Sequence, residues 1–194
     1  MRSLPVGLFL VAFLTICSGA PSFNRVGRPR FFLRDEKRTA GNVDMEACLK
    51  AHNQLRAKHN ALPLSWDTKL ANDAQKWAND LVKLGKMMHA TGTGEGENLY
   101  WSASTSKVAT CVDAVEAWAS EEKDYPVDHP PQTFEEFANN GKAIGHYTQE
   151  VWKATKKVGV AIATKKDGVF FNTYIVARYY PPGNMLGDFG SNVE

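Results

Sequence analysis

The chain has 194 residues, of which 43% are hydrophobic and 23% are charged. A chain of this length is expected to form one domain, and this hydrophobic fraction is sufficient for a buried core. Its 23 basic and 21 acidic residues leave a net charge of +2. Because it also carries no zinc-finger or RNA-binding signature, nucleic-acid binding is not expected.

Residues 1–20 have the pattern of a secretory signal peptide. Arg2 supplies the positive charge, an apolar run extends from Leu4 to Ile16, and small residues lead to Ala20, where cleavage is expected. The run is short for a membrane span, and the alternative interpretation is an uncleaved anchor. No later stretch predicts a transmembrane segment, so the sequence predicts a secreted, extracellular protein.

Residues 21–43 form a basic leader without a regular hydrophobic period, which is typical of a disordered segment. Lys37 and Arg38 form a dibasic pair of the kind that secretory-pathway proteases cut. The leader is therefore interpreted either as a propeptide removed after Arg38 or as a solvated tail that is never cut.

Three cysteines are present, and Cys17 lies in the expected signal peptide. The remaining two, Cys48 and Cys111, form an even pair in an oxidising compartment, which favours a disulfide bond. The alternative is two separate buried thiols. A bond between them would join two predicted helices that are distant in the sequence.

Three helices are predicted in the first two thirds of the chain. The first covers residues 44–59, with Asp44 as a suitable N-cap. The second begins after Asp67 and ends at Gly85, which is a favourable residue for terminating a helix. The third is expected over about 105–123, where apolar residues recur at helical spacing.

Strands are expected mainly near the end of the chain. Residues 158–164 and 170–180 are rich in β-branched and aromatic side chains, and the Asp-Gly between them indicates a hairpin. An earlier strand is predicted at 98–102, and short helices near 135–138 and from 146 to about 154. Helices combined with a mostly antiparallel sheet predict an α+β domain with α-β-α layers.

Two His and two Glu residues can form a polar or metal-binding pocket. His89 and Glu97 flank a glycine-rich loop, which can bring them to one site. Glu121 lies at the end of the third predicted helix, and His146 begins the short helix predicted from 146 to about 154. Imidazole and carboxylate groups are suitable ligands for zinc or another divalent cation. The periodicity alone does not choose between Glu97 and Glu95.

Four ordered motifs resemble those of the CAP superfamily, which contains cysteine-rich secretory proteins, antigen 5 and pathogenesis-related 1 proteins. The motifs are His52–Arg56, Gly96–Leu99, Gly145–Trp152 and Tyr179–Asn184. The resemblance covers residues 44–190, followed by a polar tail at 191–194. The chain most resembles the Golgi-associated plant-pathogenesis-related subgroup, but in a secreted form, because it begins with a signal peptide and lacks the Met-Gly needed for myristoylation.

The resemblance implies a single α-β-α sandwich with a cleft that sometimes holds zinc or another divalent cation. Matched by motif, the cleft residues are His89, Glu97, Glu121 and His146. The matches favour Glu97 over Glu95, and Glu121 over its neighbour Glu122. The chain departs from the family at Glu150, where an apolar residue is usual. This side chain would change the charge of the cleft if it reached it, and would have no consequence if it faced solvent.

Two classes of function follow from the resemblance. The first is a non-enzymatic extracellular binding module for a lipid, a sterol or a protein, with a role in defence, venom or the extracellular matrix. The alternative is a divalent-cation-dependent hydrolase or protease that uses the His/Glu cleft. The same four side chains could instead form a buried polar network that only joins helices. No catalytic residue is assigned, because Ser102, Ser104 and Ser106 lack a nucleophile-elbow motif.

The remaining aromatic and charged residues are given structural interpretations. His52 is expected to be a core histidine, and His59 and His129 are expected in solvent. Trp101 is expected in the core or at the mouth of the cleft, and the other tryptophans in the core: Trp66, Trp77, Trp118 and Trp152. A basic cluster is expected to be a solvated face or to contact anionic lipid or polysaccharide; it comprises Lys153, Lys156, Lys157, Lys165 and Lys166.

Overall fold

The computed structural model of the protein describes residues 39–41, 43–138 and 141–194. The expected signal peptide, most of the basic leader and the expected cleavage sites at Ala20, Lys37 and Arg38 lie outside these residues. Within the described chain, no helix is long and apolar enough to cross a membrane.

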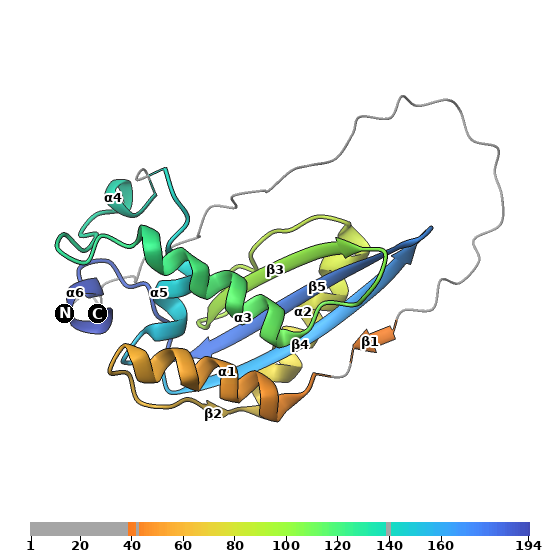
Figure 1. Cartoon of the computed structure of the whole chain (residues 1–194), viewed down its shortest axis with the longest axis horizontal. Helices are drawn as coiled ribbons and strands as arrows, with labels where there is room; N and C mark the ends of the chain where they lie inside the picture. The colour runs from red at the N-terminus through yellow and green to blue at the C-terminus, as the bar shows by residue number, and fades with distance from the viewer. Residues whose placement is uncertain (1–38, 42, 139–140) are drawn as a thin grey trace, which may run out of the picture.

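One sheet forms the centre of the molecule (Figure 1). Strands β4 (Lys157–Asp167) and β5 (Phe170–Tyr180) form the predicted hairpin, and β3 (Gly96–Ser104) pairs antiparallel with the other side of β5. β1 (Thr39–Gly41) pairs antiparallel with β4, while the short β2 (Ser65–Trp66) runs parallel to it. The order β1-β4-β5-β3 places β3 at one edge, and the mostly antiparallel sheet is confirmed.

Helix α2 (Thr68–Leu84) covers one face of the sheet. Asp67 caps it by accepting bonds from two backbone N–H groups, and Gly85 ends it with a φ of 64°, in the left-handed region that glycine adopts easily. A side chain at Gly159 would place its Cβ 2.1 Å from the backbone nitrogen of Ala71, so this glycine permits the helix to approach the sheet closely. The apolar side of the helix packs on strand residues Leu99, Ala161, Ala163, Tyr174 and Val176.

The opposite face carries α1 (Met45–Lys58), α3 (Cys111–Ala119) and α5 (Gly145–Val151). The short helices complete the connections: η1 (Ser120–Asp124), α4 (Phe134–Ala138) and α6 (Phe189–Asn192). Buried residues of α1 and α3 pack against the inner side chains of β4 and β5, including Val158, Val160, Ile162 and Ile175. This confirms the predicted α-β-α sandwich.

The third helix begins later than predicted, at Cys111 rather than near residue 105. Thr110 and Asp113 form a capping box: the Thr110 hydroxyl accepts a bond from the Asp113 N–H, and the Asp113 carboxylate accepts one from the Thr110 N–H. The preceding residues form the connection from β3, because a helix starting earlier would forgo this cap.

Thr110→Ala is therefore expected to lower the free energy of unfolding by about 1 kcal/mol, because the Asp113 N–H loses its capping partner. Urea denaturation measures this change. Thr105→Ala, at an exposed position on the same connection, is the control and should leave the midpoint unchanged. Equal midpoints for the two variants would contradict the assigned cap.

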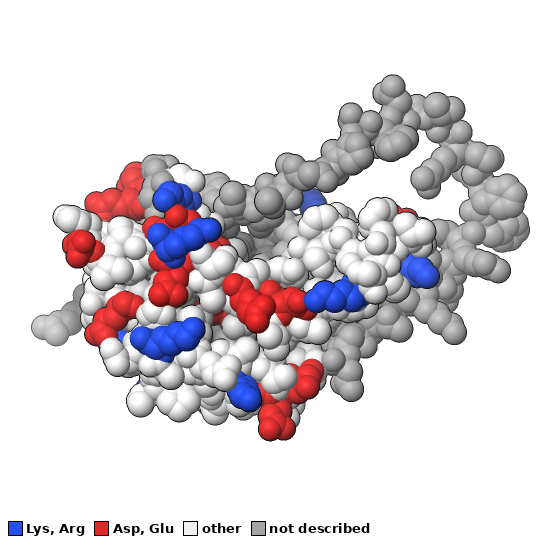
Figure 2. Space-filling model, in the orientation of Figure 1, with Lys and Arg blue, Asp and Glu red and all other residues white. Residues whose placement is uncertain are grey.

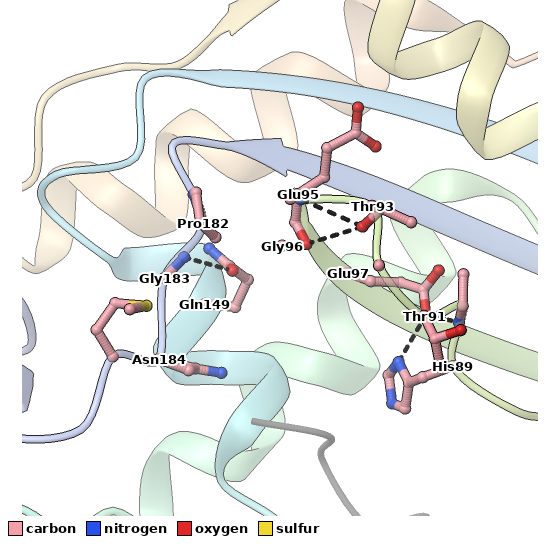
Figure 3. A pocket seen from close by; sticks show the side chains of 14 residues that line it. His89, Thr91, Thr93, Glu95, Gly96, Glu97, Gln149, Pro182, Gly183 and Asn184 are labelled. Atoms are coloured by element: carbon pink, nitrogen blue, oxygen red, sulfur yellow. Dashed lines mark hydrogen bonds and ion pairs between the residues drawn. The ribbon is translucent and has the colours of Figure 1, made fainter. Parts of the chain in front are cut away.

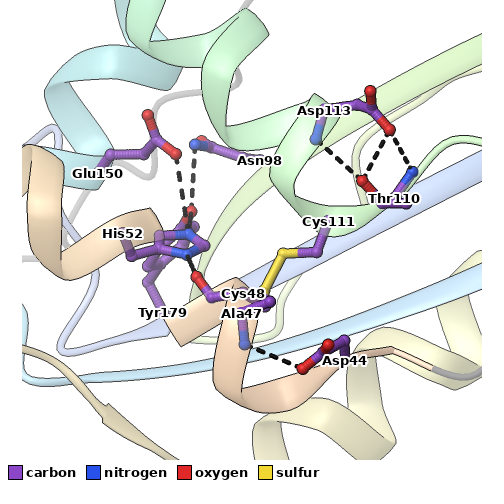
Figure 4. Close-up of a disulfide and its surroundings, with 10 residues drawn as sticks. All are labelled: Asp44, Ala47, Cys48, His52, Asn98, Thr110, Cys111, Asp113, Glu150 and Tyr179. Carbon is purple, nitrogen blue, oxygen red and sulfur yellow. Dashed lines mark hydrogen bonds and ion pairs between the residues drawn. A yellow bond between two sulfur atoms is a disulfide. The ribbon is translucent and has the colours of Figure 1, made fainter. Parts of the chain in front are cut away.

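A disulfide bond joins Cys48 of α1 to Cys111 of α3, as predicted (Figure 4). Their Cα atoms are 5.4 Å apart, and both residues lie in the core. The bond spans a sequence separation of 63 residues and holds the two helices together on one face of the sheet.

Arg56 joins α1 to the end of α5. Its guanidinium group is buried and donates hydrogen bonds to four backbone carbonyl groups, those of Leu62, Glu150, Trp152 and Thr155. Removal from water lowers the pKa of Arg56 to about 10. The position of α5 is thus fixed by a side chain of the first helix.

The prediction that His59 is solvated is wrong, while His129 is exposed as expected. The ring of His59 packs edge-on against Tyr147, and its Nδ1 atom lies 2.7 Å from the carbonyl oxygen of Glu194. The last residues, expected only as a polar tail, cover this ring, and Val193 is buried beside them. A contact between residues 59 and 194 leaves no local signal in the sequence.

The tryptophans divide into three groups. Trp118 and Trp152 are buried in the core, and Trp66 and Trp77 are partly buried against it. Trp101 is 42% exposed on the edge strand β3.

The lysines expected to form one basic face have different contacts. Lys153 pairs with Glu194 and Lys157 with Asp67, while Lys166 lies 5.5 Å from the centre of the Phe171 ring. The face shown in Figure 2 carries basic and acidic side chains in mixed order rather than one broad area of a single sign.

Candidate functional site

His89 and Glu97 form the first of two imidazole–carboxylate pairs. His89 Nδ1 lies 2.7 Å from Glu97 Oε1, which also accepts a bond from the N–H of Ala90. The other carboxylate oxygen lies 2.8 Å from Nη2 of Arg178, the β5 residue directly opposite Glu97 in the sheet. The three side chains thus form a row in which Glu97 lies between a buried guanidinium group and the imidazole.

Glu95 does not contact His89. Its carboxylate lies 3.1 Å from the ammonium group of Lys69 and 3.8 Å from Nη1 of Arg178. Glu95 and Glu97 are two residues apart and both lie near the Arg178 guanidinium group, but only Glu97 reaches the imidazole.

His146 and Glu121 form the second pair. His146 Nδ1 lies 2.6 Å from Glu121 Oε1, and the other carboxylate oxygen accepts bonds from the N–H groups of His146 and Tyr147 at the start of α5. The Trp118 ring stacks on the imidazole with a centroid distance of 6.1 Å. The neighbouring Glu122 has a different partner: its Oε1 lies 3.6 Å from His59 Nε2.

Both imidazole rings are therefore held in the same way. A carboxylate at Nδ1 favours the tautomer with a proton on that nitrogen, which leaves the lone pair of Nε2 available. Among the described residues, neither His89 nor His146 has a hydrogen-bond partner at Nε2. This arrangement is suited to binding a cation or to accepting a proton.

A cavity of about 250 Å³ lies beside His89 (Figure 3). Its walls are the loop from His89 to Glu97, Gln149 of α5 and the segment Pro182–Met185. Gly96 leaves room for the Gln149 amide here, because a Cβ at this position would lie 2.1 Å from the Gln149 side-chain oxygen and would displace it. A second hollow, of about 490 Å³, lies between the same loop and α2 and also reaches His89.

β3 connects the two pairs. Glu97 belongs to the first pair, and the next residue, Asn98, donates a bond to the backbone carbonyl of His146. His146 and Glu121 do not line the cavity beside His89. The four expected residues thus form two linked pairs rather than one closed group.

A closed metal site does not form from these four residues. Within the described chain, the only three metal-ligating side chains with their ligand atoms within 4.8 Å of one another are Cys48, His52 and Cys111. The two cysteines form a disulfide, so their sulfur atoms are not thiolate ligands. In the two pairs, the carboxylates bind Nδ1 and are placed to orient the imidazoles rather than to ligate a metal themselves.

Glu150 lines neither hollow beside His89 and does not face solvent, so neither of the two cases considered for it applies. It is 0% exposed, its Oε1 lies 3.8 Å from His52 Nε2, and no hydrogen bond reaches either carboxylate oxygen within the described chain (Figure 4). Burial, and to a smaller extent the charge of Glu121, raise the pKa of Glu150 well above its usual value.

His52 is a core histidine, as predicted. Its Nδ1 lies 2.9 Å from the carbonyl oxygen of Cys48 and its Nε2 lies 3.0 Å from the Tyr179 hydroxyl. Burial lowers the pKa of His52 to about 4. The ring is therefore neutral at physiological pH, with Nδ1–H donating to Cys48 and Nε2 accepting from Tyr179.

Sequence reasoning missed Arg178 as a partner of the cleft. A single arginine in the otherwise uncharged run Phe170–Tyr180 was a usable signal, because a charge in a central strand is buried only where it has a partner. His59 and its neighbour Glu122 were also missed, and they depend on the fold of the chain end.

The three layers and the two imidazole–carboxylate pairs define the class: a CAP-type α-β-α sandwich. Residues 49–179 match the sequence pattern of the cysteine-rich secretory protein family, and the chain belongs to this family.

Individual relatives agree with this assignment. The chain is 35% identical over 150 residues to human Golgi-associated plant pathogenesis-related protein 1, covering 75% of this chain and 88% of that protein. It is 37% identical over 140 residues to pathogenesis-related protein 1C of Nicotiana tabacum, covering 72% and 76% of the two chains. The crystal structure of NaASP2 with Zn²⁺ has a TM-score of 0.58 and 25% identity, covering 73% of this chain and 81% of that one.

Proposed function

We propose that this extracellular CAP-domain protein is a secreted, non-enzymatic binding module whose cleft holds a divalent cation, preferably Zn²⁺, and an extracellular ligand. The observation that carries the proposal is the arrangement of His89 and His146. Each ring has its Nδ1 bound by a carboxylate, which leaves Nε2 for a cation. The signal-peptide pattern of residues 1–20 supports secretion.

Two imidazole nitrogens would supply an open zinc site rather than a structural one, because a closed site requires four ligands. A bound cation would supply positive charge and coordination positions for oxygen atoms of a ligand. Glu97 and Glu121 would hold the two rings in place. The relative crystallised with Zn²⁺ shares the fold and supports this choice of metal.

The lining of the cavity indicates the chemistry of the ligand. Polar groups of Thr91, Thr93, Gln149 and Asn184 surround it, together with glycine backbone. Its volume of about 250 Å³ is at or below the lower end of the range of typical small-molecule sites. This favours a polar extracellular ligand, such as a protein segment with carbonyl or carboxylate groups, over a whole sterol or lipid in this cavity.

The alternative function is a cation-dependent hydrolase. The Glu97–His89 pair favours it, because a carboxylate-bound imidazole can act as a general base on water. The nearby serines do not supply a nucleophile: Ser104 and Ser106 bond to each other at the end of β3 away from Gly96. Ser104 lies seven residues along the strand from Glu97, which separates it from the His89–Glu97 pair by roughly 23 Å.

Isothermal titration with ZnCl₂ tests the proposed cation site. The double variant His89→Ala/His146→Ala is expected to lose zinc binding, and Glu97→Gln to weaken it by about tenfold through loss of ring orientation. Glu95→Gln, which changes the same loop without touching an imidazole, is the matched control. Thermal unfolding of each variant verifies that the fold is intact.

The outcome separates the two functions. Unchanged zinc affinity in the folded double variant would refute the cation site. Zinc-dependent peptide cleavage by the wild type that is lost in the same variant would instead favour the hydrolase. A peptide or lipid recovered from the secreted protein would identify the class of ligand.

A further inference from the structure

The outward edge of β3 can be assigned residue by residue. The carbonyl oxygen of Val158 accepts a bond from the Asp67 N–H, so the backbone groups of Val158 point away from β5. The backbone N–H and C=O groups of the odd-numbered residues of β4 therefore point toward β5. These residues lie opposite even-numbered residues of β5. The backbone groups of the odd-numbered residues of β5, among them Ile175 and Thr173, therefore point toward β3. Their partners in β3 are Tyr100 and Ser102, so the backbone groups of Leu99, Trp101 and Ala103 face outward. The bond from the Trp118 indole to the Leu99 carbonyl agrees with this assignment.

Two consecutive outward residues have unpaired backbone groups. Within the described chain, the N–H and C=O groups of Trp101 and Ala103 make no hydrogen bond beyond the sheet, and both residues are exposed. The run from Asn98 to Ser106 contains no charge and no proline. Edge strands that remain single usually carry lysine, proline or a bulge, because these features prevent pairing.

We propose that β3 pairs antiparallel with β3 of a second copy of this chain, with a two-fold axis at Ser102. Trp101 of each copy lies opposite Ala103 of the other, and their outward groups exchange four hydrogen bonds. The indole ring then covers the small Ala103 side chain of the second copy. This contact removes from water an indole that is 42% exposed in the single chain.

The side chains favour this register and are compatible with a second copy of the chain as the partner. A two-fold axis at Trp101 would place the two indoles directly opposite and would require the Leu99 carbonyl, which the Trp118 indole already occupies. An axis at Ala103 would pair Trp101 with Thr105, which lies beyond the end of the strand. Pairing at Ser102 avoids both conflicts and brings no like charges together, since the edge is uncharged.

The pairing joins two sheets into one and separates the two clefts. Gly96, where β3 begins beside the cleft, lies six residues from Ser102, so the two clefts are about 40 Å apart at opposite ends of the joined strands. The edge contact is small, so the dimer is weak and depends on concentration. A dimer of this form would bind two sites on one partner.

Sedimentation equilibrium over a range of protein concentrations tests the pairing. The wild type is expected to show a monomer–dimer equilibrium, and Ala103→Pro to weaken it at least tenfold. Proline at this position removes an outward N–H but leaves the bonds to β5 intact, so the fold is retained. Ala103→Lys should also weaken the dimer, because a lysine on an edge strand opposes pairing and the two new charges lie diagonally across the two-fold axis.

Val169→Lys is the matched control, because it introduces the same charge at a 66% exposed position in the turn between β4 and β5, which is not on the outward edge of β3. A wild type that remains monomeric at the highest concentration, or a dimer weakened equally by Val169→Lys, would overturn the proposal. A dimer unchanged by Ala103→Pro would also overturn it. These results are independent of zinc binding.

The register is tested by oxidative cross-linking. Ser102→Cys should form a covalent dimer, because the two residues at position 102 face each other across the two-fold axis. The Ser102 hydroxyl makes no hydrogen bond within the described chain, so cysteine is a conservative replacement. Ser104→Cys should remain uncross-linked, since its opposite residue is Tyr100. Cross-linking at 104 but not at 102 would overturn the register.

Discussion

Replacing both cysteines, with Cys48→Ala and Cys111→Ala, is expected to lower the free energy of unfolding by about 4 kcal/mol. The bond closes a loop of 63 residues, and without it the unfolded chain gains the conformational freedom of that loop. Because the loop contains α2 and the whole of β3, the cleft residues His89 and Glu97 lie within it. Guanidinium denaturation of the double variant measures the change.

The control for this experiment is the wild type treated with a thiol reductant. Both samples lack the cross-link, so their unfolding midpoints should agree closely, apart from the small effect of the missing sulfur atoms. A double variant as stable as the oxidised wild type would show that the bond contributes nothing to stability.

Glu150→Leu is expected to stabilise the protein at neutral and alkaline pH by on the order of 1–4 kcal/mol, because it replaces an unpaired buried carboxyl by an apolar group. Burial raises the pKa of Glu150 in the folded state. The folded protein therefore holds a proton that the unfolded chain releases above about pH 4.5, and stability falls as the pH rises from there to the folded pKa.

The contribution of His52 to stability has the opposite pH dependence. Burial lowers its pKa from 6.5 to about 4, so its contribution to stability is present above pH 6.5 and is lost as the pH falls toward 4. The two slopes oppose each other between pH 4.5 and 6.5 in the wild type.

The difference in the free energy of unfolding between Glu150→Leu and the wild type reports the titration of the Glu150 carboxyl group. This difference should be small near pH 4 and should grow as the pH rises above 4.5. Thermal unfolding measured at several pH values tests it. Glu116→Leu, at an exposed position on α3, is the control and should show no such growth. A pH-independent difference for Glu150→Leu would indicate that the carboxyl does not titrate in this range.

The helices α1 and α2, the hairpin and the disulfide could be predicted because their signals are local or few. Asp67 and Gly85 mark the two ends of α2 directly, and two cysteines outside the signal peptide permit only one pairing. The apolar spacing extends to residues before the capping box at Thr110, so it predicts too early a start for α3. Periodicity identifies an apolar face, whereas the cap determines where the helix begins.

Fewer features of the cleft could be predicted from the sequence. The motifs identified His89, Glu97, Glu121 and His146, but not that they form two separate pairs. The role of Arg178 depends on the register between β3 and β5, which places it opposite Glu97. The burial of Glu150 depends on the packing of α5 against α1, and its position inside a polar motif gave no indication of this.

The four carbonyl groups around Arg56 have a mechanical consequence for the cleft. They take the place of a hydration shell around the buried guanidinium group, and two of them belong to residues at the end of α5. Since α5 also begins with His146, any motion that displaced this helix would leave a cation unsolvated in the protein interior. The imidazole at position 146 is therefore anchored, through α5 and the Arg56 side chain, to α1.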